Sequence, residues 1–156
     1  MTWLTYIPFE WLRAVIRSFR KTFFTKPRPK GEYLVIDPTG NTLEYNVRSL
    51  VALLGSRSYS PNWELSYNRK GESLNLARVV YAKDEDQPDI VWWQIHVRGW
   101  VQPDGTIELT AHWEPEPTEY SKPHLNGVGF DREKGMDYLK ATLTQSDFDF
   151  EVVYKL

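Results

Sequence analysis

The chain has 156 residues, the size of one ordinary domain, and its 41% hydrophobic and 26% charged residues exclude disorder of the whole chain. It contains no cysteine, which excludes a disulfide framework, a thiolate nucleophile and cysteine-ligated zinc or iron–sulfur sites. The net charge of −2 hides an asymmetry: residues 1–30 carry seven Lys and Arg against one Glu, and residues 31–156 carry twelve against twenty acidic residues. The sequence therefore predicts a basic N-terminal arm on an acidic body.

Residues 7–24 place apolar side chains at helical spacing and turn the basic side chains away from that stripe. Such a helix suits an anionic membrane surface or a protein partner, and the alternative is a helix packed on its own acidic body. The residues assigned to membrane or partner docking are Trp11, Arg13, Arg17, Phe19, Arg20, Lys21 and Phe23. Because Pro27 and Pro29 end the helix, we predict an N-terminal unit of helix and stiff linker over 1–30, followed by a single α+β domain over 31–156.

The first part of this domain is predicted to combine a hairpin and a short helix. Residues 32–36 and 42–45 flank an Asp-Pro-Thr-Gly-Asn turn and are expected to pair. Asn46 is then expected to cap a helix with one apolar face, and Gly55 to end it. Further along, the pattern predicts a loop over 56–61, strands over 63–67 and 74–81, and an acidic loop over 83–89.

The longest alternation of apolar and polar residues lies within 89–115 and predicts the central β-hairpin. Its apolar positions, assigned to a core, are Val91, Trp93, Ile95, Val97, Val101, Ile107, Leu109, Ala111 and Trp113. Pro103, Asp104 and Gly105 favour a type I turn followed by a glycine bulge. If Gln102 and Thr106 close that turn, His96 lies opposite His112, Arg98 opposite Thr110, Gln94 opposite Glu114, and Trp100 opposite Glu108.

The last third of the chain is predicted to be a loop, a helix and a closing strand. Residues 115–130 contain His124 and favour an irregular loop, of the kind that often forms a lid or a binding loop. Asp131 is expected to cap a helix with Met136, Leu139 and Leu143 on one face, and residues 148–156 alternate as a strand. The short connections predict an α+β fold: a mostly antiparallel, curved sheet of about seven strands, two packed helices and the N-terminal amphipathic helix. A partial β-barrel is the alternative.

The polar face of the central hairpin holds the densest group of candidate binding residues. These are Trp92, Gln94, His96, Arg98, Trp100, Glu108, Thr110, His112 and Glu114. Aromatic rings beside an Arg and hydrogen-bonding side chains are typical of a site for a small ligand or a protein partner. The acidic body and the two Glu of this face argue against nucleic acid as a partner. The other interpretation is that the face is solvated or covered by the N-terminal helix.

Three functions follow from these patterns. We prefer a small, cytoplasmic, non-enzymatic protein that binds a protein partner or small ligand on this face, with no cofactor. The second hypothesis is a peripheral membrane protein anchored by the N-terminal helix. The third is a metal-dependent or acid–base hydrolase, because His96 and His112 are expected about 5 Å apart at Cβ with Glu114 nearby. Motifs for serine nucleophiles and for phosphate-binding loops are absent from the sequence.

Overall fold

The computed structural model describes residues 25–37, 43–62, 67–146 and 148–156. Six strands form one antiparallel sheet in the order β2-β3-β4-β5-β1-β6. The strands are β1 (Gly31–Ile36), β2 (Ser60–Pro61), β3 (Leu74–Tyr81), β4 (Trp92–Val101), β5 (Ile107–Pro115) and β6 (Glu151–Lys155), and the helices are α2 (Leu43–Ser56), α3 (Ser121–Leu125) and α4 (Arg132–Thr144). The α+β class with an antiparallel sheet is confirmed, with six strands in the described residues instead of seven and with the sheet open.

The β4–β5 hairpin has the register that its turn predicts. His96 pairs with His112, Arg98 with Thr110, Gln94 with Glu114, and Trp100 with Glu108. The Gln102 amide donates to the Thr106 carbonyl at 2.9 Å, and Gly105 adopts a φ of 91°. Because that φ strains residues with a Cβ, the glycine holds the turn and with it the register.

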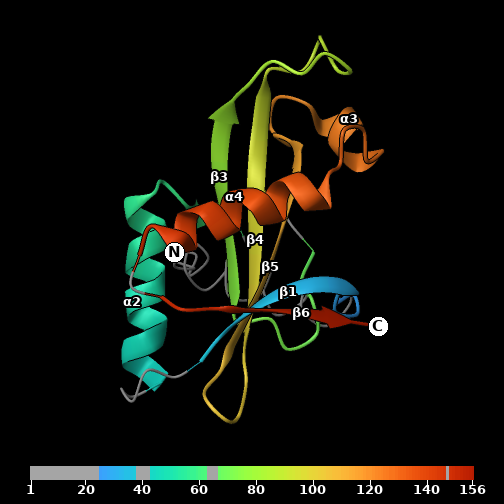
Figure 1. Cartoon of the computed structure of the whole chain (residues 1–156). Coiled ribbons are helices and arrows are strands. Elements are labelled where there is room, and N and C mark those ends of the chain that lie inside the picture. Colours follow the sequence, from blue (N-terminus) through green and yellow to red (C-terminus); the bar gives the residue numbers. More distant parts are fainter. Residues whose placement is uncertain (1–24, 38–42, 63–66, 147) are drawn as a thin grey trace, which may run out of the picture.

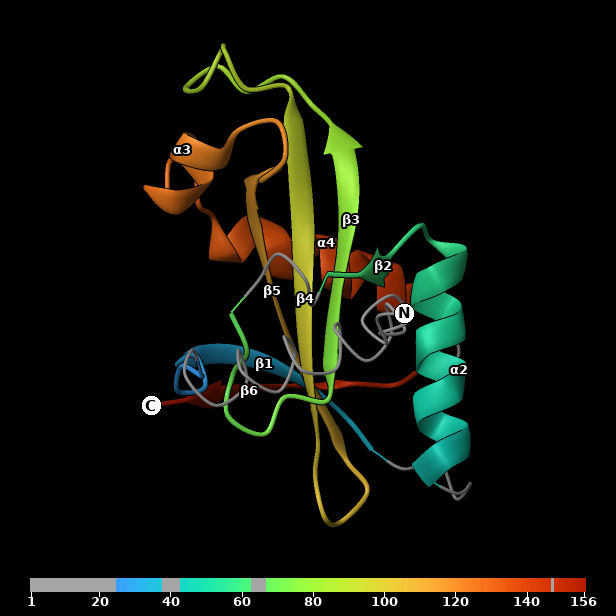
Figure 2. The ribbon, with the colours of Figure 1, turned by 180° about the vertical axis from the view of Figure 1, so that it is seen from behind.

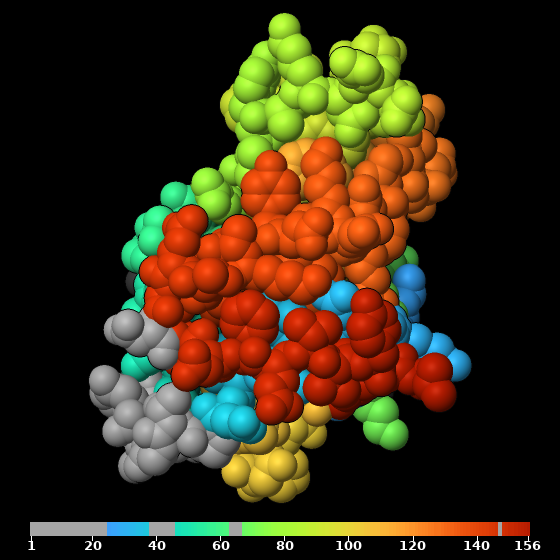
Figure 3. All heavy atoms as spheres, viewed as in Figure 1, coloured from blue at the N-terminus to red at the C-terminus, as the bar shows by residue number. Residues whose placement is uncertain are grey.

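One face of this hairpin forms the core, as the alternation predicts. The fully buried side chains on that face are Trp93, Ile95, Val97, Ile107, Leu109, Ala111 and Trp113. Helices α2 and α4 contribute Leu50, Leu54, Leu139 and Leu143 to the same apolar cluster. In Figure 1, α4 crosses the long strands and α2 runs beside β3, and Figure 2 shows α4 behind the sheet from the opposite side. Figure 3 shows that α4 and the C-terminal residues cover much of this side of the molecule.

The prediction of a hairpin between residues 32–36 and 42–45 is wrong. Strand β1 instead lies between β5 and β6 in the sheet, and residues 43–45 belong to α2. Four alternating residues are too few to separate a strand from the first turn of a helix. The predicted cap, Asn46, therefore lies inside the helix and is buried, and the helix ends at Ser56, one residue beyond the predicted end.

Two other segments differ from the predicted elements. Ser60–Pro61, predicted as loop, forms the short edge strand β2 against β3, whereas residues 63–66 of the strand predicted at 63–67 lie outside the described residues. The loop predicted at 115–130 contains α3, a helix of one turn and a half. Asp131 caps α4 as predicted, because its side chain accepts a hydrogen bond from the Lys134 amide.

The predicted amphipathic helix at 7–24 lies outside the described residues, so the docking role of Trp11, Arg13, Arg17, Phe19, Arg20, Lys21 and Phe23 stays a prediction. Of the predicted linker, residues 25–30 contact the body. The Lys26 amide donates to the Asn68 carbonyl at 3.0 Å, and the Lys70 amide donates to the Lys26 carbonyl at 2.9 Å. Among the described residues, no helix has the length and apolar character that crossing a membrane requires.

Candidate functional site

A cleft of about 320 Å³ lies on the polar face of the β4–β5 hairpin, on the side of the strands that faces away from the core. Six of the nine predicted binding residues line it: Gln94, His96, Arg98, Thr110, His112 and Glu114. Segments from elsewhere in the chain complete the walls, among them Pro29, Tyr67, Arg69, His124, Phe130 and Arg132. The cleft therefore forms only when four distant parts of the chain meet over one hairpin.

The other three predicted binding residues lie outside the cleft. Trp92 is 42% exposed and contacts the edge of the Tyr81 ring. Trp100 is buried, donates its indole hydrogen to the Lys70 carbonyl at 2.9 Å and lies under the Arg28 guanidinium. Glu108 pairs with Arg28 and Lys155. Trp100 and Glu108 therefore have a structural role: through Arg28 and Lys155 they hold the N-terminal segment and β6 against the sheet.

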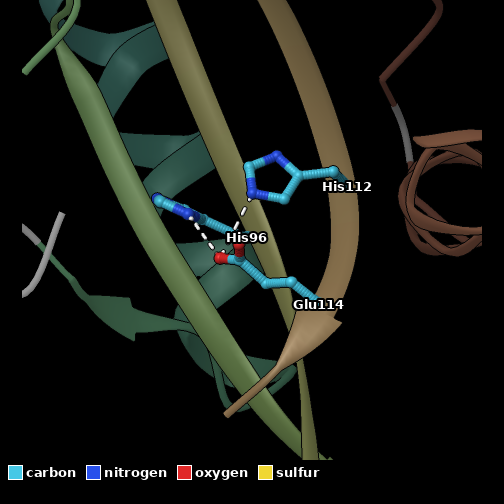
Figure 4. A group of neighbouring side chains, drawn as sticks. All are labelled: His96, His112 and Glu114. Carbon is cyan, nitrogen blue, oxygen red and sulfur yellow. Dashed lines mark hydrogen bonds and ion pairs between the residues drawn. The ribbon is translucent and has the colours of Figure 1, made fainter. Parts of the chain in front are cut away.

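Glu114 is the centre of the polar contacts within the cleft. Its Oε1 lies 3.1 Å from His96 Nδ1 and 3.2 Å from His112 Nε2 (Figure 4). The same oxygen accepts a hydrogen bond of 2.6 Å from the side-chain amide of Gln94. Its Oε2 lies 3.6 Å from His124 Nδ1. All three histidines of the chain thus surround one carboxylate.

The His96 ring has a hydrogen-bonding partner at each nitrogen. Nδ1 faces Glu114, and Nε2 lies 2.8 Å from Asn75 Oδ1. Burial lowers the pKa of His96 to about 3, and the Glu114 carboxylate, which would accept a hydrogen from the protonated ring and so acts in the opposite direction, does not offset it. The ring is therefore neutral at pH 7. Since an amide oxygen only accepts, Nε2 carries the ring hydrogen and Nδ1 has a lone pair.

The Glu114 carboxylate is ionised in this environment. Burial raises its pKa, but the hydrogen bond from His112, together with the neighbouring His96 ring, outweighs burial and holds the pKa well below the usual range. A buried, ionised carboxylate among imidazoles can bind a cation or exchange protons with a ligand.

His124 reaches the cleft because α3 lies over the end of β5. Its Nδ1 lies 3.0 Å from the Pro115 carbonyl, which accepts the Nδ1 hydrogen. The sequence indicated a functional loop at 115–130, but the position of His124 depends on how that loop folds over β5. The pattern of the loop alone does not determine this fold.

Two arginines of the cleft, Arg69 and Arg132, were not predicted from the sequence. Arg132 donates to the Thr110 hydroxyl at 3.0 Å and to the Glu32 carbonyl at 3.1 Å, and Arg69 donates to the Pro27 carbonyl at 3.1 Å. Arg98, which was predicted, forms an ion pair of 2.6 Å with Glu72. Burial and then the nearby charge of Arg98 lower the pKa of Arg69. Three guanidinium groups therefore lie within electrostatic reach of one another.

Helix α4 sets the position of His112. A Cβ on Gly135 would lie 2.3 Å from the His112 Cα, so only glycine permits this approach of helix to strand. The sulfur of Met136 accepts a hydrogen bond of 3.0 Å from the Ala111 amide, next to His112. The Phe130 ring lies 4.9 Å from the His112 ring, centroid to centroid, on the cleft side.

Family models, curated proteins and solved structures were compared with the chain, and none of them matches it.

Proposed function

We propose that the chain is a binding protein that holds a small anionic ligand, a carboxylate or a phosphate, in the cleft on the polar face of the β4–β5 hairpin. The observation that carries the proposal is the convergence of Arg69, Arg98 and Arg132 on a cleft whose lining, among the described residues, contains one carboxylate, that of Glu114. A protein partner remains the alternative for this face.

The shape of the site favours a small ligand over a protein partner. A volume of about 320 Å³ lies at the lower end of the range for ligand sites, roughly 300 to 1,000 Å³. Gln94, His96 and Arg98 line the cleft and are buried. On a strand face that is open to a protein partner, such side chains would be exposed. The site thus offers polar groups within a concavity, which is the arrangement that orients small molecules.

The charge of the site favours an anion. In the described part of the chain, the Arg98 guanidinium forms an ion pair with Glu72, whereas those of Arg69 and Arg132 donate to neutral oxygens. The Nε atoms of all three arginines are buried without a hydrogen-bond partner in the described part of the chain. Carboxylate and phosphate oxygens are the acceptors that guanidinium groups bind best, and they would reduce the repulsion among the three cations.

Thermal unfolding and calorimetry with inorganic phosphate, citrate and succinate test the proposal. The chain is treated with a chelator first, so that metal ions do not contribute. A ligand that binds only the native state raises Tm, by an amount equivalent to about 2.7 kcal/mol at a concentration one hundred times Kd. We expect at least one of these anions to raise Tm, and Arg69→Gln to reduce the shift.

Arg57 provides the matched control, because it is exposed at the end of α2 and does not line the cleft. Arg57→Gln removes the same charge from the chain and should leave the shift unchanged. Equal losses in the two variants would show that net charge alone attracts the anion. No shift with any of the three anions would contradict the anionic ligand.

A further inference from the structure

We propose that His96 Nδ1, His112 Nε2 and Glu114 Oε1 bind one divalent transition-metal ion, Zn²⁺ in the first instance, at the histidine end of the cleft. This inference goes beyond anion binding and does not depend on it. The three residues come from adjacent strands in a fixed register and point toward one another (Figure 4).

The spacing of the donor atoms suits such an ion. One ligand atom from each residue lies within 4.8 Å of the others, and the two nitrogen–oxygen distances are 3.1 and 3.2 Å. Ligands about 2.1 Å from a tetrahedral Zn²⁺ lie about 3.4 Å from one another. Small side-chain rotations therefore suffice to bring the three atoms around one ion.

The hydrogen bonds of His96 leave a lone pair directed at the carboxylate. Asn75 Oδ1 accepts from Nε2–H, so in the neutral ring Nδ1 and Glu114 Oε1 are two acceptors facing each other at 3.1 Å. A cation between them turns this unfavourable contact into two favourable ones. A ligating imidazole that donates its other ring hydrogen to an oxygen is the usual arrangement at metal sites, and Asn75 provides that oxygen.

Binding requires a change at His112. Its Nε2 now donates to Glu114, so the ring must shift its hydrogen to Nδ1 before Nε2 can coordinate the ion. No net proton is released when only the tautomer changes.

The donor set selects the class of ion. Two imidazole nitrogens and one carboxylate oxygen suit Zn²⁺ and its transition-metal neighbours, whereas Mg²⁺ and Ca²⁺ prefer oxygen ligands throughout. Three protein ligands leave at least one coordination position for a molecule in the cleft, which contains Arg98 on the same strand as His96. His124 is not included, because its Nδ1 hydrogen is directed at the Pro115 carbonyl.

The test uses the full chain without a histidine tag, stripped with a chelator and titrated with Zn²⁺ alone at pH 7.5 by calorimetry and thermal unfolding. We expect one Zn²⁺ per chain and a higher Tm. His112→Ala should weaken binding more than tenfold, since even the loss of an outer hydrogen-bond partner costs about 10- to 100-fold. Glu114→Gln keeps the size of the side chain and should weaken binding similarly if the alanine variant does not fold.

Glu151→Gln, at an exposed position on β6 that does not line the cleft, is the control and should change the affinity less than threefold. Co²⁺ in place of Zn²⁺ should give the visible absorption of a low-coordinate site in the parent and not in Glu114→Gln. A stoichiometry well below one overturns the proposal, as does an equal loss of affinity in Glu151→Gln and Glu114→Gln. Nitrogen-15 spectra that show His96 doubly protonated with Zn²⁺ present would also overturn it. Because no anion is added, failure here leaves the proposed anion binding intact.

Discussion

His96 and His112 lie directly opposite each other on β4 and β5, with their ring centroids 4.9 Å apart. The turn at Pro103, Asp104 and Gly105 sets this relationship, although it lies some distance along the hairpin from both rings. A shift of β5 by one residue against β4 would turn His112 to the core side and bring the apolar positions of β5 into the cleft. The register of one hairpin therefore determines both the packing of the core and the composition of the cleft.

The two faces of the hairpin should respond differently to substitution. Trp113 is buried, stacks on Trp93 at 5.2 Å and on Tyr138 at 5.4 Å, and has Lys134 above its ring. Trp113→Ala should therefore lower the free energy of unfolding in urea by about 3 to 5 kcal/mol. Trp92→Ala, on the neighbouring strand but 42% exposed, should cost less than about 1 kcal/mol.

Replacement of both His96 and His112 by Gln should cost less stability than Trp113→Ala. Glutamine can still donate to Glu114, and both rings lie on the cleft side, away from the apolar cluster. We expect a folded variant by circular dichroism, with altered ligand binding. If this variant unfolds as readily as Trp113→Ala, the histidines stabilise the fold and the division between the two faces is wrong.

Gly135 tests the contact between α4 and β5. A Cβ at this position meets the His112 backbone at 2.3 to 2.6 Å, so Gly135→Ala must push the helix from the strand. Overpacking of this kind costs about 1 to 3 kcal/mol. Gly55, in α2, has no neighbouring atom within 4 Å of the added Cβ, and Gly55→Ala should be neutral or stabilise by up to about 1 kcal/mol.

Urea unfolding of the two glycine variants checks this contrast, and binding at the cleft adds a second measurement. Gly135→Ala should also weaken ligand binding, because the displaced helix moves His112. Equal effects of the two substitutions on stability would mean that α4 adjusts without cost and does not position the strand.

Much of the fold could be predicted where local pattern decides the outcome. The turn chemistry of Gly105 and the alternation around Trp93 and Trp113 fix the register and the core face, because both act over a few residues. The cap at Asp131 is equally local. Strand β1 shows where local pattern is no longer sufficient. Its residues were correctly predicted as a strand, but its partner strands were not, because β5 and β6 lie more than seventy positions away in the sequence.

The cleft was predictable only in part, for the same reason. His96, His112 and Glu114 share a face of one hairpin, so their proximity follows from the register. Arg69 and His124 enter the cleft through packing between distant segments, which alternation does not encode. Whether the polar face is buried or exposed could not be decided from the sequence, because a polar strand face covered by neighbouring segments has the same sequence pattern as one covered by water.

The N-terminal cap of α4 can be tested by itself. The Asp131 carboxylate accepts a hydrogen bond of 2.9 Å from the Lys134 amide, which otherwise has no partner in the helix. Asp131→Ala should cost about 0.5 to 2 kcal/mol in urea unfolding, whereas Asp131→Asn keeps the acceptor and should cost a few tenths. If the two variants are equally unstable, the charge at the helix start matters and the hydrogen bond does not.

Glu108 should make part of the stability dependent on pH. Burial raises its pKa, but the hydrogen bonds from Lys155 and Arg28 outweigh burial and lower it. Because the pKa of Glu108 in the folded chain lies below the ordinary glutamate value of 4.5, the unfolded chain binds the proton more readily between the two values. The stability that Glu108 contributes is therefore present above about pH 4.5 and is lost as the pH falls through the folded pKa.

Glu108→Gln removes this titration and separates the charge from the shape of the side chain. At pH 7 the variant should be less stable than the parent by about 1 to 3 kcal/mol, the usual contribution of hydrogen bonds to charged groups. Below pH 4.5 the difference should shrink, because the parent then loses the same charge.

Glu151, exposed on β6 and without an ion pair among the described residues, is the control, and Glu151→Gln should differ little from the parent at either pH. The parent and Glu108→Gln could instead differ in free energy of unfolding by the same amount at pH 7 and at pH 3.5. Glu108 would then stabilise the fold by packing and not by its ion pairs with Arg28 and Lys155.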